Sequence, residues 1–208
     1  MTVRVLLLAA GQSSRMGGAD KLLMDVDGQP CLRTLALRAR AAGLPVTVTV
    51  PAPDHPRARV LVDLDVDVLA VPEANLGMGH SIGAGVASLP HGSSAVMVVP
   101  ADMPELCSED FTALAEAHER NPMAILRARD ANGRHGHPVV FPSDLLGDLQ
   151  RLSGDRGAAG IVQAHQGRCI FIDLPGQRAT TDLDTPSDWA DWRKSKKNLT
   201  AKNKETEQ

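Results

Sequence analysis

Residues 6–21 read Leu6-Leu7-Leu8-Ala9-Ala10-Gly11-Gln12-Ser13-Ser14-Arg15-Met16-Gly17-Gly18-Ala19-Asp20-Lys21, and this stretch decides the fold. An apolar run typical of a buried strand leads directly into a loop of small residues with two cations, Arg15 and Lys21. Small residues let backbone N–H groups approach an anion closely, and the cations offset the charge of a polyphosphate that leaves water. We therefore predict a first strand followed by a phosphate-binding loop; the alternative is an ordinary surface turn.

Two familiar nucleotide signatures do not fit this loop. The dinucleotide fingerprint needs G-x-G-x-x-G, but Gly11 is followed by Gln12-Ser13 and the next glycines are Gly17 and Gly18. A P-loop needs Lys followed by Ser or Thr, whereas Leu22 follows Lys21. The loop therefore argues against a dinucleotide-dependent oxidoreductase and against a P-loop enzyme.

Short apolar runs alternate with helix-length segments, which is typical of parallel strands joined by crossover helices. We expect an α/β fold, a three-layer α/β/α sandwich with a mostly parallel, Rossmann-like sheet. Asn132-Gly133 lies between two strand-like runs and predicts a tight turn with a small antiparallel insertion. Strands are expected at residues 3–9, 46–50, 66–71, 95–99, 124–129, 139–141 and 168–173. Helices are expected at residues 31–42, 56–64, 80–88, 108–119, 142–151, 158–165 and 186–193.

The composition favours a single domain that acts on small molecules. The chain has 208 residues, 43% of them hydrophobic, with a formal charge of −3, so nothing indicates attraction to nucleic acid or to a membrane. Aromatic residues make up only 2%, which weakens any proposal of base-stacking platforms. We expect one domain over residues 1–193 and a mobile, polar tail over residues 194–208.

The cysteines and the first residues indicate the compartment. Cys31, Cys107 and Cys169 lie far apart in the sequence and form no C-x-x-C pair, as expected for reduced thiols. The apolar run at residues 3–10 is too short to span a membrane, and no long apolar signal segment precedes a cleavage site. We expect a cytoplasmic protein.

A second motif places one carboxylate at the end of a buried strand. Residues 96–104 read V-M-V-V-P-A-D-M-P, so Asp102 follows the strand at the sheet edge where open α/β sheets bind ligands. A carboxylate there suits Mg²⁺, which takes one or two protein carboxylates and completes its shell with waters and phosphates. Asp102 is the first candidate metal ligand, and the alternative is a turn or helix-capping aspartate.

A third motif, T-D-L-D-T-P-S-D-W at residues 181–189, carries two aspartates at alternate positions. Residues two apart in an extended segment share a face, so Asp182 and Asp184 are both able to look toward one site. Either of them could instead cap the last helix, which begins near Pro186. Asp188 is expected only to favour the helix N-terminus.

Two further segments carry candidate binding residues. In E-A-N-L-G-M-G-H-S, at residues 73–81, a glycine loop leads into a helix, and the amide of Gly79 and the hydroxyl of Ser81 are candidates for nucleotide contacts; Ser81 is alternatively an N-cap. In G-R-H-G-H-P-V, at residues 133–139, two histidines two apart lack the further ligands of a zinc site. Arg134, His137 and Arg156 are candidate contacts for an anionic acceptor, or else ordinary solvated loop cations.

Taken together, these motifs resemble those of the molybdenum cofactor (molybdopterin) cytidylyltransferases, within the molybdopterin and sugar-phosphate nucleotidyltransferases. The loop L-A-A-G-Q-S-S-R-M-G with a following Lys, the A-D-M-P element, G-M-G-H-S, G-H-P-V with G-D-R-G-A, and D-L-D-T-P match in order over residues 3–192. The resemblance implies a single nucleotidyltransferase domain over residues 1–193. The resemblance also implies that Asp184 is a better second metal ligand than Asp182.

The resemblance implies transfer of CMP from CTP to the terminal phosphate of molybdopterin, with Mg²⁺ on Asp102 and Asp184 and release of pyrophosphate. Arg15 and Lys21 would neutralise the leaving phosphates, and the resemblance implies nucleotide contacts from Ala9, Ala10, Gly11, Ser13, Gly79 and Ser81. A molybdoenzyme is a possible recipient. Ala10 favours CTP over GTP by resemblance. The alternatives are guanylyl transfer, another phosphate acceptor, or a non-catalytic cofactor carrier or insertion chaperone.

Overall fold

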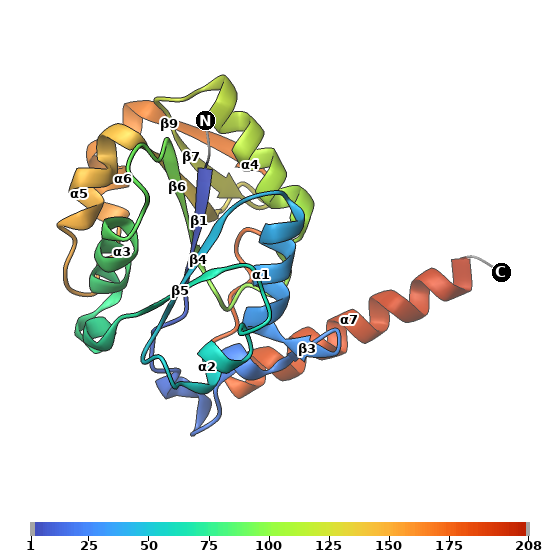
Figure 1. Cartoon of the computed structure of the whole chain (residues 1–208). Coiled ribbons are helices and arrows are strands. Elements are labelled where there is room, and N and C mark those ends of the chain that lie inside the picture. Colours follow the sequence, from blue (N-terminus) through green and yellow to red (C-terminus); the bar gives the residue numbers. More distant parts are fainter. Residues whose placement is uncertain (1–2, 207–208) are drawn as a thin grey trace.

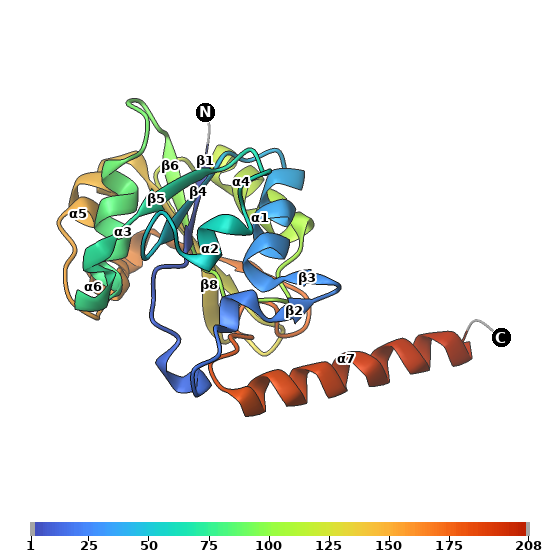
Figure 2. The ribbon, with the colours of Figure 1, turned by 60° about the horizontal axis from the view of Figure 1, so that its bottom comes forward.

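The computed structural model describes residues 3–206, with side chains through residue 198. A central sheet lies between two helical layers, with α1 and α4 on one face and α3, α5 and α6 on the other (Figure 1). This arrangement confirms the predicted three-layer α/β/α sandwich. The helix α7 leaves the body at one end and projects away from it (Figure 2).

The main sheet contains all seven predicted strands. Its order is β5-β4-β1-β6-β8-β7-β9, and only β8 runs antiparallel to its neighbours β6 and β7. The central strand β1 pairs in parallel with both β4 and β6. The sheet is therefore mostly parallel, as predicted. The strands are β1 Val3–Leu8, β4 Val46–Val50, β5 Asp67–Ala70, β6 Ala95–Pro100, β7 Ile125–Arg129, β8 His135–Pro142 and β9 Cys169–Asp173.

The helices follow the predicted order with several different boundaries. The first crossover after β4 is helical only over four residues, because the β-branched Val60 and Val62 follow and the chain must soon enter β5. The segment at residues 142–151 divides into a 3-10 turn and a short α-helix. The helices are α1 Cys31–Ala41, α2 Pro56–Arg59, α3 Met78–Ala87, α4 Ser108–Arg120, α5 Leu146–Gln150, α6 Ala159–Ala164 and α7 Pro186–Thr206.

Antiparallel pairing occurs in two places. The turn predicted at Asn132-Gly133 joins β7 to β8, so the expected insertion is a strand of the main sheet; Gly133 has a φ of +77°. A separate two-stranded sheet, which the sequence analysis missed, pairs β2 (Asp25–Val26) with β3 (Gln29–Pro30). Asp27 and Gly28 form its turn with φ values of +55° and +87°. Asp-Gly is a favoured pair for such turns, so this signal was present in the sequence.

The last helix extends well beyond the predicted residues 186–193. Thr185 is its N-cap, because its hydroxyl accepts from the Asp188 amide at 3.2 Å while Asp188 accepts from the amides of Asp184 and Thr185. The expected role of Asp188 is thereby confirmed, and neither Asp182 nor Asp184 caps the helix. Residues 194–206 continue α7 as a helix, and the mobility expected of residues 194–208 stays a prediction. Among residues 3–206, no helix is long and apolar enough to cross a membrane.

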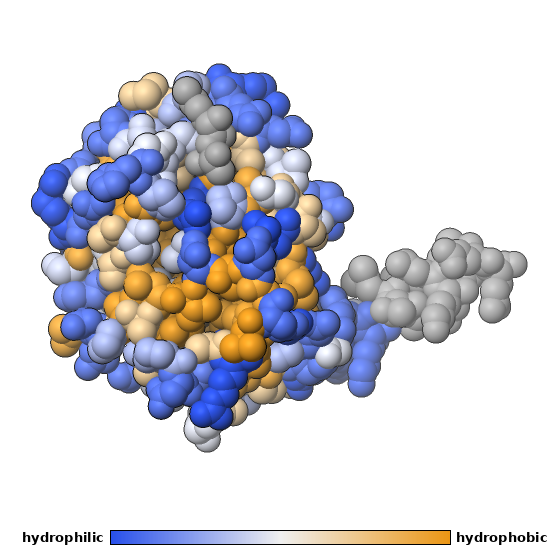
Figure 3. Space-filling model, viewed as in Figure 1, coloured by the Kyte–Doolittle hydropathy of each residue, from blue (hydrophilic) through white to orange (hydrophobic). Residues whose placement is uncertain are grey.

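Two apolar clusters hold the layers together on opposite faces of the sheet. Alternation along β1 sends Val5 and Leu7 toward α1 and α4, and Leu6 toward α3 and α5. Helix α3 lies so close to β1 that a Cβ on Gly85 would sit 2.4 Å from Leu6 Cδ1. Apolar side chains also gather in the middle of the face shown in Figure 3, where the edge strand β5 leaves Val68 42% exposed. The clusters fix the strand ends that carry the candidate site.

Candidate active site

Four cavities surround the carboxyl ends of β1 and β6. A cavity of about 600 Å³ lies between the glycine loop and the segments that follow β4 and β5. A cavity of about 320 Å³ contains Lys21 and Asp102, and one of about 200 Å³ contains Arg15, Lys21 and Asp184. The fourth, of about 190 Å³, contains His137 and Arg156. The cavity around Asp102 shares wall residues with each of the other three, so it connects them.

The two candidate metal ligands meet although 82 residues separate them in the sequence. The Leu183 amide donates to the carbonyl oxygen of Asp102 at 3.1 Å, and the Leu183 side chain is buried. Asp184 follows directly and accepts from Lys21 Nζ at 2.6 Å, while Asp102 accepts from the same ammonium group. One lysine therefore joins both carboxylates, a contact that the sequence analysis did not predict.

Asp182 lies near this pair but does not share its contacts. Desolvation raises the pKa of Asp182, and the negative charges of Asp102 and Asp184 raise it further. No group of three His, Cys, Asp or Glu side chains gathers as a metal site anywhere in the part of the chain that the structure describes. Asp102 and Asp184 are thus the two carboxylates that Lys21 brings together.

The cations of the loop are engaged by these carboxylates. Arg15 Nη1 lies 2.7 Å from Asp184 Oδ2, and Lys21 contacts Asp184 and Asp102. Burial disfavours the Lys21 ammonium, but the charges and hydrogen bonds of the two aspartates outweigh burial and raise the pKa of Lys21. Lys21 is therefore a cation at neutral pH. A nucleotide would have to exchange these pairs for pairs with phosphate.

Asp102 has one oxygen without a partner. The residue is 8% exposed, Oδ2 accepts from Lys21, and Oδ1 is buried without a hydrogen bond to any group that the structure describes. An unsatisfied buried carboxylate oxygen is costly, and a cation is the partner that relieves the cost. Two carboxylates with one orphaned oxygen also fit Mg²⁺, which uses few protein ligands and adds phosphate oxygens.

The predicted loop residues line the cavities with one exception. Gly11 borders three of them, Ala10 and Ser13 border two each, and Ala9 is buried behind the loop. Ser13 adopts a left-handed backbone with φ of +51°, which is uncommon for a residue with a Cβ. The loop is therefore held in a strained conformation by its surroundings.

Sequence reasoning missed Arg57, which lies in α2 and is only 2% exposed. Its Nη1 donates to the carbonyl oxygens of Ala9 and Gly11 at 2.6 and 2.5 Å. Its other nitrogens donate to Asp20 at 2.7 and 2.9 Å and to Ser13 Oγ at 2.9 Å. No local motif marks this residue, because its partners lie about forty residues earlier in the chain.

The two residues predicted in α3 have different surroundings. Ser81 is buried and lines the cavity that contains Asp102, and it is not the N-cap, since Gly77 holds that position. The amide of Gly79 donates to Gly154 O at 2.8 Å, and a Cβ on Gly79 would sit 2.8 Å from the backbone of Ser153. The Gly79 amide is therefore engaged by the protein, contrary to the expectation that it is free to contact a nucleotide.

His137 and Arg156 meet, as expected, in the fourth cavity. Apolar side chains form most of its wall, and Arg127, which sequence analysis did not select, joins them. Burial, together with the positive charge of Arg127, lowers the pKa of His137 to about 4. The expected cation at this position is therefore a neutral imidazole at pH 7. Arg156 and Arg127 have no ion-pair partner within residues 3–206.

Arg134 lies apart from this cavity. Its Nε pairs with Asp130 Oδ2 at 2.7 Å, and Nη2 donates to Thr180 Oγ1 at 3.2 Å. These bonds tie the turn between β7 and β8 to the segment after β9. The structure thus does not bring Arg134 together with His137 and Arg156, and its contacts are those of a residue that holds a loop.

The comparisons with known proteins agree with this geometry. Residues 5–169 match the family model of the MobA-like NTP transferase domain. No curated protein matches the chain by sequence. The crystal structure of Rv0371c from Mycobacterium tuberculosis H37Rv is similar with a TM-score of 0.78, 23% identity and coverage of 92% of this chain and 97% of that chain.

Two further solved structures, both complexes with a ligand, have a similar fold. A manganese complex of Rv0371C from Mycobacterium tuberculosis has a TM-score of 0.75, 22% identity and coverage of 91% of this chain and 97% of that one. CMP:2-keto-3-deoxy-manno-octonic acid synthetase complexed with CTP has a TM-score of 0.73, 14% identity and coverage of 98% and 100%. These likenesses show the fold, and the family model covers well over half of the chain. The chain belongs to the MobA-like NTP transferase domain family and is a nucleotidyltransferase.

Proposed function

We propose that the chain transfers CMP from CTP to the terminal phosphate of molybdopterin in a Mg²⁺-dependent reaction. The observation that carries the nucleotidyl-transfer chemistry is the buried, unpartnered Asp102 Oδ1 beside Lys21 and Asp184. A carboxylate with a free oxygen, next to two cations and a glycine loop, suits a metal-bound polyphosphate. The choice of molybdopterin rests on the motif resemblance.

The sizes and linings of the cavities support a proposed place for each part of the nucleotide. The cavity of about 600 Å³ has the size for a base and ribose, and Pro51, Val71 and Pro72 form an apolar part of its wall. The triphosphate would extend from there along Gly11 and Ser13 to the cavity that contains Arg15 and Lys21. The α-phosphate would then lie beside Asp102, between nucleotide and acceptor.

The side chains of this protein supply positive charge and hold the reactants in position, and none of them needs to act as a general base. The acceptor phosphate is already largely dianionic at neutral pH, since a phosphate monoester loses its second proton near pH ~6. One of its oxygens attacks the α-phosphorus, the bond from that phosphorus to the bridging oxygen breaks, and pyrophosphate leaves with that electron pair. Arg15 and Lys21 stabilise the departing charge after they release Asp184. Mg²⁺ held by Asp102 and Asp184 would polarise the phosphoryl oxygens.

The acceptor would occupy the cavity around His137. Arg127 and Arg156 carry positive charge without a carboxylate partner there, and Ile82, Val98 and Phe141 provide apolar surface. A neutral His137 is able both to donate and to accept a hydrogen bond. Such a wall suits an acceptor that joins a phosphate to a ring with polar edges, as molybdopterin does.

The motif resemblance also favours CTP over GTP as the nucleotide. Ala10 lines the larger cavity, and one methyl group beside a base gives a modest steric filter, worth roughly 1–3 kcal/mol. In a further member of the fold, the octonic acid synthetase, CTP is the bound nucleotide. We therefore place CTP first and GTP second.

A pyrophosphate-release assay tests the proposal. Purified protein is mixed with molybdopterin and Mg²⁺, and CTP, GTP, ATP and UTP are compared, with EDTA in a parallel series. We expect release with CTP that depends on molybdopterin and stops with EDTA. Release with GTP alone would favour guanylyl transfer. Calorimetric binding of nucleotide that needs no metal, without any pyrophosphate release, would instead identify a cofactor carrier.

A further inference from the structure

The carbonyl groups of the glycine loop are held from one side by a single buried guanidinium. Arg57 Nη1 binds the carbonyl oxygens of Ala9 and Gly11, at 2.6 and 2.5 Å. Within residues 3–206, the only cis peptide bond is His137-Pro138, so the peptides after Ala9 and Gly11 are trans. In a planar trans peptide the C=O and the following N–H point in opposite directions. The amides of Ala10 and Gln12 therefore point away from Arg57.

These amides have no hydrogen-bond acceptor among the residues that the structure describes. The N–H groups of residues 10–13 donate no hydrogen bond anywhere within residues 3–206. Ala10 and Gln12 line the cavity that contains Lys21 and Asp102, whereas Arg57 lines only the neighbouring cavity of about 600 Å³, which Ala10 and Gln12 border as well. Backbone amides with no acceptor, at the wall of a cavity with a lysine, are donors that an anion would satisfy.

Arg57 also connects the loop to the lysine. Two of its nitrogens donate hydrogen bonds to the Asp20 carboxylate, at 2.7 and 2.9 Å. Asp20 in turn caps the 3-10 turn Lys21–Leu23, because it accepts from the Leu22 amide at 3.0 Å. Burial alone would raise the pKa of Asp20, but the hydrogen bonds and charge of Arg57 and the Leu22 amide lower it. One residue thus fixes both the amides and the turn that carries the lysine.

We propose that Arg57 is a positioning residue for the phosphates of the nucleotide: from outside the cavity that contains Lys21 and Asp102, it turns the Ala10 and Gln12 amides toward the phosphates and aligns Lys21. The inference rests on the proposed function, because phosphate is the anion that the amides would bind. The Arg57 charge is neutralised by Asp20, so its contribution is geometric. Loss of Arg57 frees the loop carbonyls to rotate into the cavity, where they would repel phosphate.

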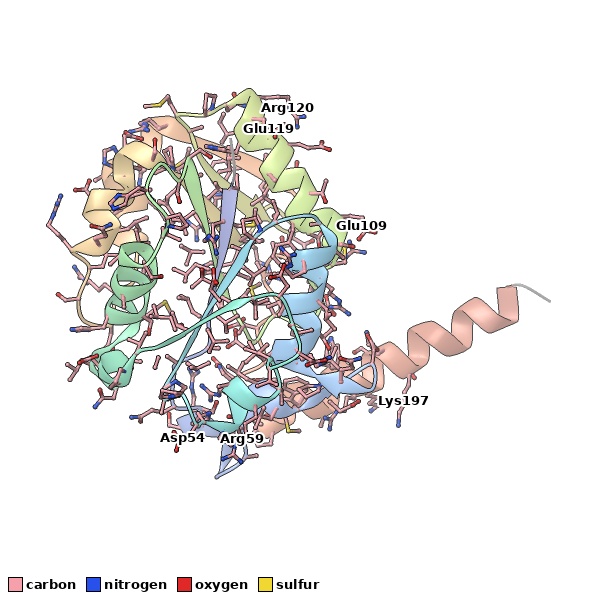
Figure 4. The ribbon with its side chains drawn as sticks, in the orientation of Figure 1. Asp54, Arg59, Glu109, Glu119, Arg120 and Lys197 are labelled. Carbon is pink, nitrogen blue, oxygen red and sulfur yellow. The ribbon has the colours of Figure 1, made fainter. Side chains whose placement is uncertain are left out.

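The test compares Arg57→Ala and Arg57→Lys with Arg59→Ala in the full-length protein. Arg59 lies in the same helix two residues on, is exposed and points outward at the rim of the molecule (Figure 4). We expect the KM for CTP and the Kd for inorganic pyrophosphate to rise roughly tenfold to a hundredfold in Arg57→Ala. Arg57→Lys should restore part of the affinity, and Arg59→Ala should match the wild type. A folded Arg57→Ala protein with wild-type KM and Kd would overturn the inference.

A second measurement uses only the wild-type protein, so it does not depend on whether a variant folds. Inorganic pyrophosphate is titrated into the ¹⁵N-labelled wild-type protein with Mg²⁺, and the amide resonances of Ala10 and Gln12 are followed. Downfield shifts of both amide protons that saturate with binding are expected. Saturable binding that leaves both resonances in place would contradict the inference. Saturating shifts in a protein that transfers no nucleotide would refute the proposed function and leave the assignment of Arg57 intact.

Discussion

Asp102 and Asp130 are buried aspartates that each follow the end of a strand of the same sheet, yet their surroundings differ. Asp130, after β7, is 1% exposed, and its oxygens accept from the Asn132 amide at 2.9 Å, from Arg134 at 2.9 and 2.7 Å and from Thr180 at 2.8 Å. Asp102, after β6, accepts from Lys21 alone, and Oδ1 has no partner within residues 3–206.

The difference separates a carboxylate that holds the fold from one that is prepared for a ligand. A saturated carboxylate has nothing left to offer a metal, and removing it leaves its donors unpaired. An unsaturated one costs stability in the free protein and regains it when a cation binds. The same contrast distinguishes Arg134, which is used within the protein, from Arg156, which has no ion-pair partner among the described residues.

The largest effect is expected from Asp102→Asn. Loss of the charge that holds the metal should lower kcat for pyrophosphate release by roughly two to three decades, the typical cost of one preorganised group. The Tm should stay close to that of the wild type, because Oδ1 has no partner to lose and Lys21 keeps its ion pair with Asp184. Release assays and thermal unfolding check both halves. Wild-type turnover by the folded variant would remove Asp102 from the metal site.

A smaller contrast is expected between Asp184→Asn and Asp182→Asn. Asp184 forms ion pairs with Arg15 and Lys21. Removal of its charge should lower kcat and weaken Mg²⁺ binding, each by roughly one to two decades. Asp182 shares neither contact, and its variant serves as the matched control with near wild-type kinetics. Magnesium titrations of the release rate measure the effect. The ranking of the two aspartates is reversed if Asp182→Asn is the more damaged variant.

The smallest effect on activity is expected from Asp130→Asn, whose damage should be to stability. Burial opposes the Asp130 charge, but hydrogen bonds from Arg134, Thr180 and Asn132 lower its pKa from 3.8 to about 2. Because the pKa of Asp130 is lower in the folded than in the unfolded protein, its carboxylate stabilises the folded state above pH ~4. This stabilisation is lost as the pH falls toward about 2. The Tm of Asp130→Asn at pH 7 should therefore lie several degrees below that of the wild type, while kcat is unchanged.

The acid dependence completes that test. The gap in Tm between the wild type and Asp130→Asn should narrow as the pH is lowered from about 4 toward about 2, because the wild type then loses the same charge. Thermal unfolding measured along this series gives the gap directly. A difference in Tm that does not change with pH would mean that the charge of the Asp130 carboxylate contributes nothing to stability. The proposed contrast between Asp130 and Asp102 would then be wrong.

The sequence determined the parts of this protein that depend on local pattern. Apolar runs predicted every strand of the main sheet, because burial on both faces requires them, and small residues before Arg15 and Lys21 predicted the loop. Alternation predicted that Asp182 and Asp184 share a face, and the structure buries Leu183 between them. The Asp27-Gly28 turn was equally legible and was missed.

Only the tertiary structure decided which polar groups are already used. Helix α2 brings Arg57 beneath a loop about forty residues distant in sequence, burial makes His137 neutral, and Thr180 with Asp130 engages Arg134. The Gly79 amide is likewise used by Gly154. Residue type and spacing state what a group is able to bind, but whether it is free to bind depends on partners that arrive from distant segments when the chain folds.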